Sequence, residues 1–444
     1  MHFTPHSESI IEEMLKTIGV LNFEELIRTV PSQVRCRENW DEPGLKESDV
    51  RKKYRNLAEE NEPVTRIQSY LGGGVYEHFI PSVVNHLASR PEFVTSYTQY
   101  QPESNQGMLQ GLFEYQTLLC RLTGMDVSNS SHYDGATSLA EAVLMALRNK
   151  PGKILYSKYL HPHYTEVLKT YLFNDRSCLF EVTPYEGTMT AEAFPKEEEI
   201  SAVIVQSPNF LGIIEDMISL SEWAHARGAV LIAVVNPVSL GMLEAPGNLG
   251  ADMVVGEGQP LGNSLSFGGP YFGFMCVKKE WMRKMPGRIV GQTADKAGRR
   301  GFVLTLQTRE QHIRREKAVS NICSNEALCA LRAAIYLAYL GETGFKNLSE
   351  ECFEKAHLLQ EKLSSIPGLV PVYNKPFFNE FAVRIKHKKI ASVLSKLRRN
   401  QIAAGIRLNQ FYHDHANDFL IAVTETKTAE NLDYYYEIMK EVLA

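Results

Sequence analysis

The feature that most constrains the fold is an alternation of short apolar runs with amphipathic stretches between residues 65 and 325. Helical periodicity is expected over 107–123, 136–149 and 219–227. Five runs are typical of buried strands: KILYS, AVIVQ, AVLIAVV, DMVVG and YFGFMCV. Strands that alternate with helices build a largely parallel sheet with helices on both faces. The sequence therefore predicts an α/β domain.

The remaining segments predict two further parts of the chain. A length of 444 residues exceeds the ~250–300 at which single cores stop growing. Residues 1–64 are expected to form a helical arm, with two short helices over 7–30 and an exposed helix over 46–62. Residues 65–325 are expected to form the large domain. Residues 326–444 are expected to form a smaller α+β lobe with a long linking helix.

Composition narrows the function classes. Hydrophobic residues make up 44% of the chain and charged residues 22%, as in ordinary globular proteins. A net charge of −5 implies no bulk attraction to nucleic acid or membrane. Seven scattered cysteines without a CxxC pair indicate a reducing cytoplasm and no metal site. The first residues do not match a signal peptide, and no apolar run has the length of a membrane span.

The segment 251–274, ADMVVGEGQPLGNSLSFGGPYFGF, has a strand, a glycine turn and a glycine pair closed by proline. In one large enzyme class, a lysine in such a segment binds pyridoxal phosphate (PLP). Here no lysine lies between Lys196 and Lys278. Asn236 ends the preceding apolar run, where an aspartate would pair with the pyridine nitrogen, and asparagine supplies no full negative charge. A polar cap at a strand end explains Asn236 equally well.

Two other motifs have both a functional and a plain structural explanation. Gly135 and Thr137 open a helix whose N-terminus favours an anion such as phosphate. An ordinary cap by Asp134 or Thr137 is the favoured explanation from the residues alone. His161 and His163 could bind a metal or place an imidazole over a ring. A strand-to-helix turn at Pro162 is the favoured explanation there, because no further ligand accompanies them.

An aromatic and a basic segment complete the candidate residues. Tyr97, Tyr100 and Gln101 precede an amphipathic helix, where tyrosines either pack or reach into a neighbouring subunit. Residues 278–318 carry a local charge of +8. Such a run is usually a solvated face, but next to a glycine-rich segment it favours an acidic partner or a phosphate. Nucleic acid is disfavoured because RNA-binding aromatic motifs are absent.

Several long segments resemble the P-protein of the glycine cleavage system, glycine dehydrogenase (decarboxylating). Within that family they resemble the N-terminal, or α, subunit (subunit 1) of the two-subunit form. The similarity covers most of the first three quarters of the chain. The matching segments are LGGGVYEHFIPSVV, SYTQYQPESNQGMLQGLFEYQTLLCRLTG, SSHYDGATSLAEA, VVGEGQPLG, FGGPYFGF, MPGRIVGQT and LQTREQHIRREKAVSNIC.

The resemblance implies a type I PLP-dependent transferase (aspartate aminotransferase-like) fold, with a mixed, mostly parallel sheet. It implies that PLP is bound covalently by a related β subunit (subunit 2) and not by this chain. The lysine position of β-type sequences falls at about Gln259, whose carboxamide nitrogen is not nucleophilic. Together with Asn236, this substitution implies a degenerate pocket of the chain's own, whose expected residues are Gly135, Thr137, His163, Asn236 and Gln259.

The resemblance also implies a reaction and partners. Glycine is decarboxylated and its aminomethyl group passes to the lipoyl group of H-protein, within an expected (αβ)2 assembly. Tyr97, Tyr100 and Gln101 are expected to line the β-borne site. Thr308, Arg309 and Glu310 are expected near the partner's PLP phosphate, with Arg309 among the contributed catalytic residues. The basic segment is expected to guide the acidic H-protein.

Three rival functions fit parts of the pattern. A stand-alone PLP lyase or aminotransferase would need an unusual lysine such as Lys278. A scaffold or regulatory subunit would keep the pocket empty and would tolerate changes at Tyr97 and Arg309. A phosphate- or nucleotide-binding protein would use the helix start at residues 135–138, but no phosphate-loop motif accompanies it.

Overall fold

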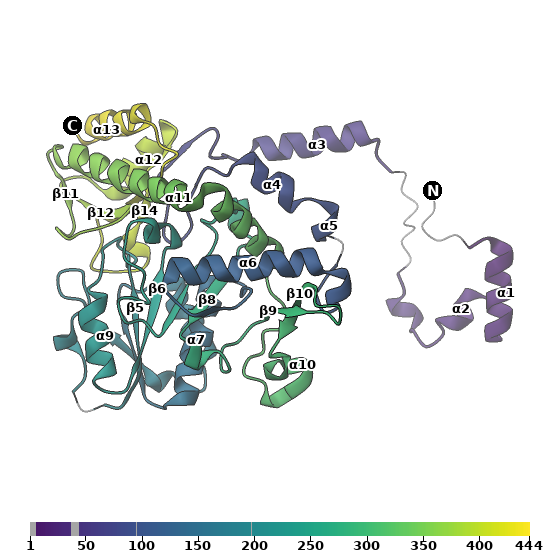
Figure 1. Ribbon diagram of the computed structural model, residues 1–444. Coiled ribbons are helices and arrows are strands. Elements are labelled where there is room, and N and C mark those ends of the chain that lie inside the picture. The colour runs from purple at the N-terminus through teal and green to yellow at the C-terminus, as the bar shows by residue number, and fades with distance from the viewer. Residues whose placement is uncertain (1–5, 37–43, 95, 197) are drawn as a thin grey trace. The chain divides into compact units, whose positions relative to one another are not determined.

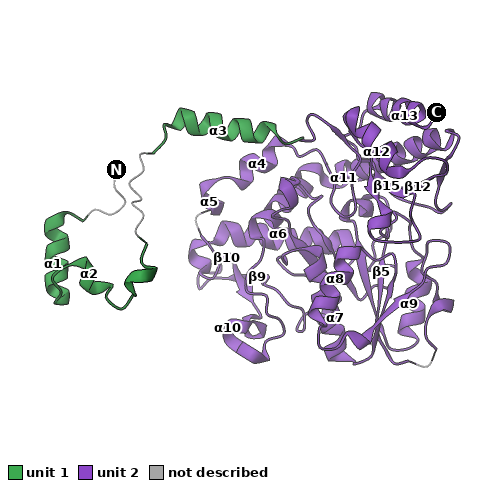
Figure 2. Cartoon of the chain, turned by 180° about the vertical axis from the view of Figure 1, so that it is seen from behind, with its two compact units in different colours: residues 1–62 green, residues 63–444 purple. Residues whose placement is uncertain are grey.

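The computed structural model describes residues 6–36, 44–94, 96–196 and 198–444, and it divides into two compact units. Unit 1 spans Met1–Glu62 and unit 2 spans Pro63–Ala444 (Figure 2). Unit 1 contains α1 (Glu8–Ile18), α2 (Phe23–Leu26) and α3 (Glu47–Glu59), which lie within the ranges 7–30 and 46–62 where helices were expected. Ser7 caps the start of α1, and Gly19 ends it with a φ of 83° that glycine adopts without strain. None of these three helices has a buried residue.

Unit 2 is built on a seven-stranded sheet with the strand order β2-β8-β7-β6-β5-β3-β4 (Figure 1). The strands from β4 to β7 are parallel, and β8 is antiparallel to both of its neighbours. The mixed, mostly parallel sheet is therefore confirmed. The strands are β2 (Val127–Ser128), β3 (Lys153–Ser157), β4 (Leu179–Val182), β5 (Ile200–Gln206), β6 (Val230–Val235), β7 (Met253–Glu257) and β8 (Gly273–Val277).

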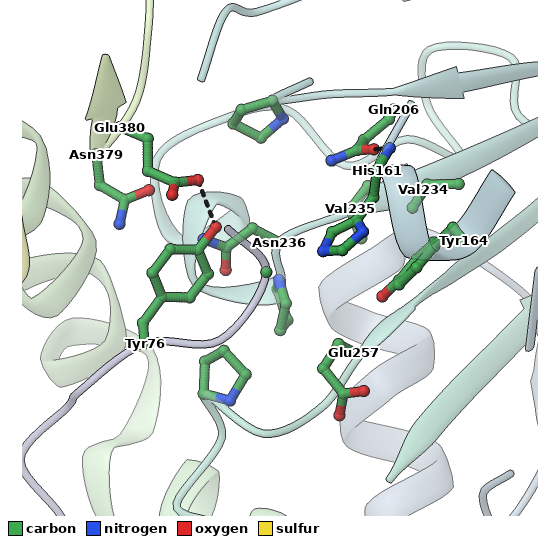
Figure 3. Close-up of a pocket in the computed structure, with 14 residues that line it drawn as sticks. Tyr76, His161, Tyr164, Gln206, Val234, Val235, Asn236, Glu257, Asn379 and Glu380 are labelled. Atoms are coloured by element: carbon green, nitrogen blue, oxygen red, sulfur yellow. Dashed lines mark hydrogen bonds between the residues drawn. The ribbon is translucent and has the colours of Figure 1, made fainter. Parts of the chain in front are cut away.

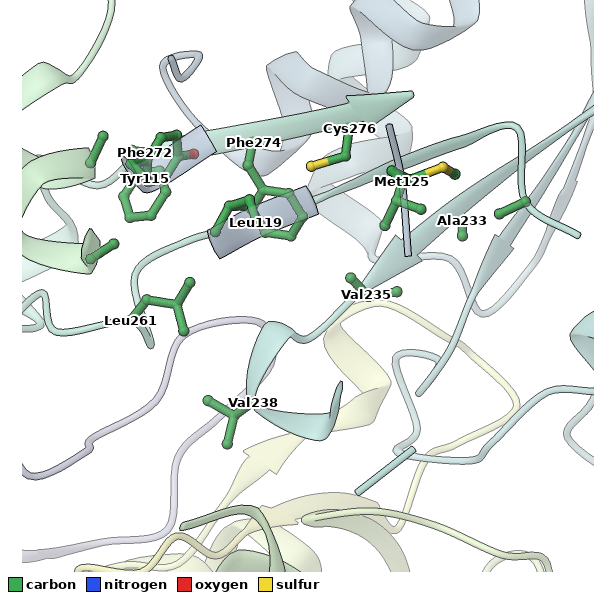
Figure 4. Close-up of a cluster of buried hydrophobic side chains, with 14 of the residues drawn as sticks. Tyr115, Leu119, Met125, Ala233, Val235, Val238, Leu261, Phe272, Phe274 and Cys276 are labelled. Atoms are coloured by element: carbon green, nitrogen blue, oxygen red, sulfur yellow. The ribbon is translucent and has the colours of Figure 1, made fainter. Parts of the chain in front are cut away.

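Alternate residues of the central strands enter two separate apolar cores, because successive side chains of a strand point to opposite faces. Leu231, Ala233 and Val235 of β6 join the first core, while Ile232 and Val234 join the second. Figure 4 shows part of the first core, where aromatic and aliphatic side chains from several elements meet. Helices α6 (Gln106–Thr123), α9 (Met217–His225) and α11 (Ala327–Ser364) pack in the first core, and α7 (Gly135–Asn149) and α8 (Pro162–Tyr171) in the second.

The C-terminal lobe has a four-stranded antiparallel sheet with the order β11-β12-β15-β14. The long helix α11, assigned as continuous across a non-helical Gly341, leads from the large sheet into this lobe. Its elements are β11 (Leu369–Pro371), β12 (Glu380–Ile385), α12 (Ile390–Arg399), β14 (Ile406–Arg407), β15 (Asp418–Ala422) and α13 (Ala429–Leu443).

Two features of unit 2 lie outside the expected pattern. Strand β1 (Gln68–Ser69) pairs in parallel with β13 (Ile402–Ala403), so residues placed at the start of the large domain are hydrogen-bonded to the C-terminal lobe. Strands β9 (Ile289–Ala294) and β10 (Arg300–Thr305) form a hairpin within the basic segment. Among the described residues, no helix combines the length and apolar character of a membrane span.

Candidate functional site

A pocket opens at the carboxyl ends of β5, β6 and β7, where open α/β sheets place their ligand sites. Gln206 ends β5, Asn236 follows β6, and Glu257 ends β7. Tyr76 and Glu380 close the opposite side (Figure 3). The free cavity volume is about 30 Å³, room for about two water molecules.

Gln259, at the position expected for the missing lysine, is buried and fully engaged by backbone groups. Its Oε1 accepts from the Tyr76 backbone N–H at 2.9 Å, and its Nε2 donates to the Tyr76 carbonyl at 2.9 Å. Nε2 also donates to the Asn263 carbonyl at 2.8 Å. A carboxamide suits this two-point pairing because it carries both an acceptor and a donor. The residue therefore joins backbone segments and presents no nucleophile.

Glu257 occupies the N-terminus of α7, where an anion would otherwise bind. Its Oε2 accepts from the Gly135 backbone N–H at 3.1 Å, and its Oε1 accepts from the Gln259 N–H at 3.1 Å. A side chain on residue 135 would collide with the Tyr164 hydroxyl, so only glycine fits there. Burial raises the pKa of Glu257 to about 8, despite these two hydrogen bonds.

The α7 cap is the ordinary one favoured from the residues. Asp134 Oδ1 accepts from the Thr137 backbone N–H at 2.7 Å. The side chain of Thr137 itself is buried. Two backbone N–H groups at the helix start therefore have acceptors within the chain. Asp134 accepts from Thr137, and Glu257 accepts from Gly135.

Asn236 also acts as a cap. Its Oδ1 accepts from the Val238 backbone N–H at 3.1 Å. Its Nδ2 is buried without a hydrogen-bond partner among the described residues. That group is a donor, so it cannot accept a hydrogen bond from a protonated ring nitrogen as an aspartate would.

The structure places His161 in the pocket, and not His163 as expected. The His161 ring stacks on Tyr164 with centroids 4.7 Å apart, and its Nε2 donates to the Gly73 carbonyl at 2.7 Å. Burial lowers the pKa of His161 to about 4, so the imidazole is neutral. His163 is exposed, because α8 begins at Pro162 and turns the next side chain away from the sheet. The expectation at His163 was therefore wrong by two residues.

These residues do not fit PLP on this chain. Gln259 cannot form the covalent bond, and Glu257 takes the backbone donor that a phosphate would need. Tyr164 lies against the helix start, and Asn236 presents a donor where an acceptor is required. Tyr76, Tyr164, Glu257 and Glu380 were not among the residues predicted for the pocket, because no local motif marks them.

A strap of residues 72–79 closes the pocket and bridges the two lobes of unit 2. Tyr76 Oη donates to Glu380 Oε2 at 2.6 Å, and the Gly73 N–H donates to Glu380 Oε1 at 2.7 Å. Burial raises the pKa of Glu380 to about 7. At the end of the strap, the Phe79 N–H donates to Glu425 Oε1 at 2.7 Å.

Of the residues expected to contact a partner, some have exposed side chains and others are hydrogen-bonded within this chain. Tyr97 is 95% exposed, and Gln101 and Thr308 are also exposed. Tyr100 Oη accepts from Arg288 Nη2 at 3.0 Å, and that guanidinium also binds the Cys323 carbonyl and Asn325 Oδ1.

Arg309 and Glu310 are held within the chain. The buried guanidinium of Arg309 donates to the carbonyls of Leu306, Met285 and Gly287. Because burial removes water from around it, the pKa of Arg309 is lowered. Glu310 Oε2 lies 3.6 Å from His312 Nδ1. Arg309 therefore faces inward in this chain, and its expected place near the partner's PLP phosphate stays a prediction.

Lys278, the lysine of the rival lyase hypothesis, lies away from the pocket. Its Nζ is 3.0 Å from Asp252 Oδ1, and Asp252 directly precedes β7. The pocket lies at the other end of the same strand. Lys278 therefore cannot replace the missing lysine.

One cluster in the described part of the chain has metal-ligand chemistry. The ligand atoms of His78, Cys352 and Glu425 lie within 4.8 Å of one another. His78 Nδ1 and Glu425 Oε2 already form a 2.7 Å pair, and burial raises the pKa of the Cys352 thiol well above its usual range. Metal ligation requires a thiolate, so the cluster is better described as a buried pair beside a neutral thiol, with His78 Nε2 lacking a hydrogen-bond partner among the described residues.

Comparison with protein families matches residues 1–439 to the model for the glycine cleavage system P-protein. The chain is 48% identical over 450 residues to the probable glycine dehydrogenase (decarboxylating) subunit 1 of Desulfitobacterium hafniense, with all of both chains covered. It is 48% identical over 448 residues to the protein of the same description from Moorella thermoacetica, again with full coverage.

Solved structures agree with these relatives. The crystal structure of glycine decarboxylase (P-protein) of the glycine cleavage system, in inhibitor-bound form, superimposes with a TM-score of 0.90 at 43% identity, covering all of both chains. The apo cysteine desulfurase of Thermococcus onnurineus NA1 matches with a TM-score of 0.62 at 14% identity, covering 90% of this chain and 99% of the other. The second match shows the type I PLP-dependent fold alone.

Proposed function

The chain belongs to the glycine cleavage system P-protein family, as a subunit 1 of glycine dehydrogenase (decarboxylating), and we propose that the PLP of the enzyme resides on subunit 2. The observation that carries this proposal is the pocket of the chain itself. Gln259 stands at the position expected for the lysine, and Glu257 and Tyr164 lie at the helix start that a phosphate would need. A subunit with this pocket acts in glycine decarboxylation through its partner.

The chain contributes side chains to the partner's site from its outer surface. Tyr97, Tyr100, Gln101 and Thr308 are the exposed members of the expected set, and their exposure supports a role in contacting subunit 2 and glycine. Tyr100 is oriented by Arg288. Arg309 and Glu310 take part indirectly, since the inward guanidinium holds the turn that carries Thr308.

Further parts of the proposal concern the other partners. The lipoylated H-protein receives the aminomethyl group, and the assembly is an (αβ)2 heterotetramer in the cytoplasm. The basic segment has exposed cationic side chains that favour an acidic partner: Lys296, Arg299, Arg300, Arg314, Arg315 and Lys317.

A second function is favoured by the same closed pocket. A subunit whose pocket is filled from within suits a pure scaffold that stabilises the partner and adds nothing to its site. The two functions differ at Tyr97. A contributed side chain makes turnover sensitive to Tyr97→Ala while assembly stays intact, and a scaffold makes both insensitive.

The proposal is tested by visible absorption of this chain alone and of the complex with subunit 2, each incubated with PLP and freed of excess. The expected result is a colourless chain and a complex whose cofactor band responds to glycine. A chain that turns yellow alone, with PLP fixed to it by borohydride, would overturn the proposal.

A further inference from the structure

The pocket is closed by two residues of one turn that act on different parts of it. Glu257 ends β7 and reaches the first backbone N–H of α7. Gln259, two residues later, pairs with both backbone groups of Tyr76. The two are coupled, since the Gln259 N–H donates to Glu257 Oε1 at 3.1 Å. One short turn therefore fills the anion position and holds the strap.

The anion position retains the backbone arrangement that binds an anion. Gly135 begins a helix of 15 residues, and the helix dipole favours negative charge at its backbone N–H groups. Residue 135 has no room for a side chain, so the approach to this N–H is kept open by glycine. The carboxyl of Glu257 stands in that approach, 91% buried.

The strap depends on the same turn. Tyr76 is held at its backbone by Gln259 of the large domain and at its hydroxyl by Glu380 of the C-terminal lobe. His161 adds a further hydrogen bond, to the Gly73 carbonyl. A ligand in the pocket would have to displace groups that are already hydrogen-bonded in pairs.

We propose that the Glu257 carboxyl is a built-in ligand of the α7 N-terminus that excludes phosphate-bearing molecules from this chain, so that restoring a lysine at position 259 does not by itself restore cofactor binding. This inference rests on the proposed function, in which PLP is carried by subunit 2. It adds that two of the obstacles to the cofactor on this chain are separable. Gln259 removes the covalent bond, and Glu257 removes the phosphate position.

The test uses the complex with subunit 2, loaded with PLP and reduced with borohydride, with mass spectrometry to assign the label to each chain. The variants are Gln259→Lys, Glu257→Ala and the double variant. We expect no label on this chain in Gln259→Lys, and at least tenfold more label in the double variant. Equal labelling of Gln259→Lys and the double variant would overturn the inference, and so would an unlabelled double variant.

A second measurement does not need the new lysine. With the subunit 2 site filled by PLP, inorganic phosphate is titrated against the melting temperature of each complex. Phosphate should raise the melting temperature of Glu257→Ala and leave that of Glu257→Gln unchanged, because the glutamine still fills the position. A phosphate effect in both variants, or in neither, contradicts the inference. Glu257→Ser replaces Glu257→Ala if the alanine variant does not assemble.

The outcomes separate this inference from the proposed function. Label on the wild-type chain would overturn the proposed function itself. Label on Gln259→Lys alone would overturn only the role of Glu257. Label on subunit 2 is the internal control, since it reports that the preparation is folded and loaded.

Discussion

The inner pocket and the outer surface around Tyr97 differ in how their polar groups are satisfied. In the pocket, Glu257, Gln259 and Glu380 are buried and hydrogen-bonded within the chain. On the outer surface, Tyr97 is 95% exposed and Phe267 is 97% exposed. The comparison supports the proposed function, in which the polar residues of the pocket are structural and the contacts with subunit 2 come from the exposed surface.

The difference between the two regions can be measured as effects of substitutions on stability and on turnover. A buried hydrogen-bonded group affects stability when it is removed, because its partners are left without water. An exposed side chain affects stability little, so a loss of turnover there reports function. Pocket variants should therefore change the free energy of unfolding, and surface variants should change turnover.

The largest effect is expected for Gln259→Ala. Three backbone groups lose their partner, so the complex should be destabilised by about 3 kcal/mol. Gln116 is a matched control, since it pairs in the same way with both backbone groups of Val290. Hydrogen exchange should become faster at Tyr76 in Gln259→Ala and at Val290 in Gln116→Ala. Faster exchange at Tyr76 in both variants would show that the strap does not depend on Gln259 in particular.

The next effect concerns pH and Glu257. The folded-state pKa is raised to about 8 from an ordinary 4.5, so the folded protein retains a proton that the unfolded chain releases. The resulting stability is fully present below the ordinary pKa and is lost as pH rises through about 8. From about pH 6 to about pH 9, the wild type should lose on the order of 2 kcal/mol more than Glu257→Gln.

Denaturant unfolding of both complexes across this range checks the pH prediction. Glu380 and Glu215, whose pKa values burial raises to about 7, are common to both proteins and cancel in the difference. Parallel curves for the wild type and Glu257→Gln would mean that Glu257 is ionised throughout.

A smaller effect is expected at the surface for Tyr97→Ala. Turnover of glycine by the complex should fall about tenfold, which corresponds to about 1.4 kcal/mol in the transition state. The melting temperature should stay unchanged, because the side chain is exposed in this chain. Tyr339, 61% exposed on α11, provides the control variant Tyr339→Ala. Equal turnover in the two variants would favour the scaffold function.

The smallest effect is expected for the basic segment. Lys317→Gln should raise the KM for H-protein about twofold at low salt and reduce its salt dependence, because one exposed cation is removed. Lys440→Gln, at an exposed lysine of α13, should change neither quantity. Steady-state kinetics at several ionic strengths measure both. An unchanged salt dependence in Lys317→Gln would remove this segment from the proposed H-protein surface.

Much of the fold follows from periodicity alone. The apolar runs KILYS and DMVVG became β3 and β7, because a buried parallel strand needs a continuous apolar sequence. The hairpin of β9 and β10 was not predicted, because its residues alternate irregularly and its turn is charged. Strand β1 was also missed, since two residues that pair with a segment 334 positions away leave no local pattern.

The candidate site also has features that the sequence predicts and features that only the structure shows. The sequence by itself determined that no lysine stands near position 259 and that asparagine ends β6, because residue identity alone excludes the covalent bond and the full charge. Only the tertiary structure decided that Glu257 meets Gly135, that His161 and not His163 faces the pocket, and that Arg309 turns inward. These outcomes depend on which distant backbone groups arrive at the same place, and burial then requires each polar group to find a partner.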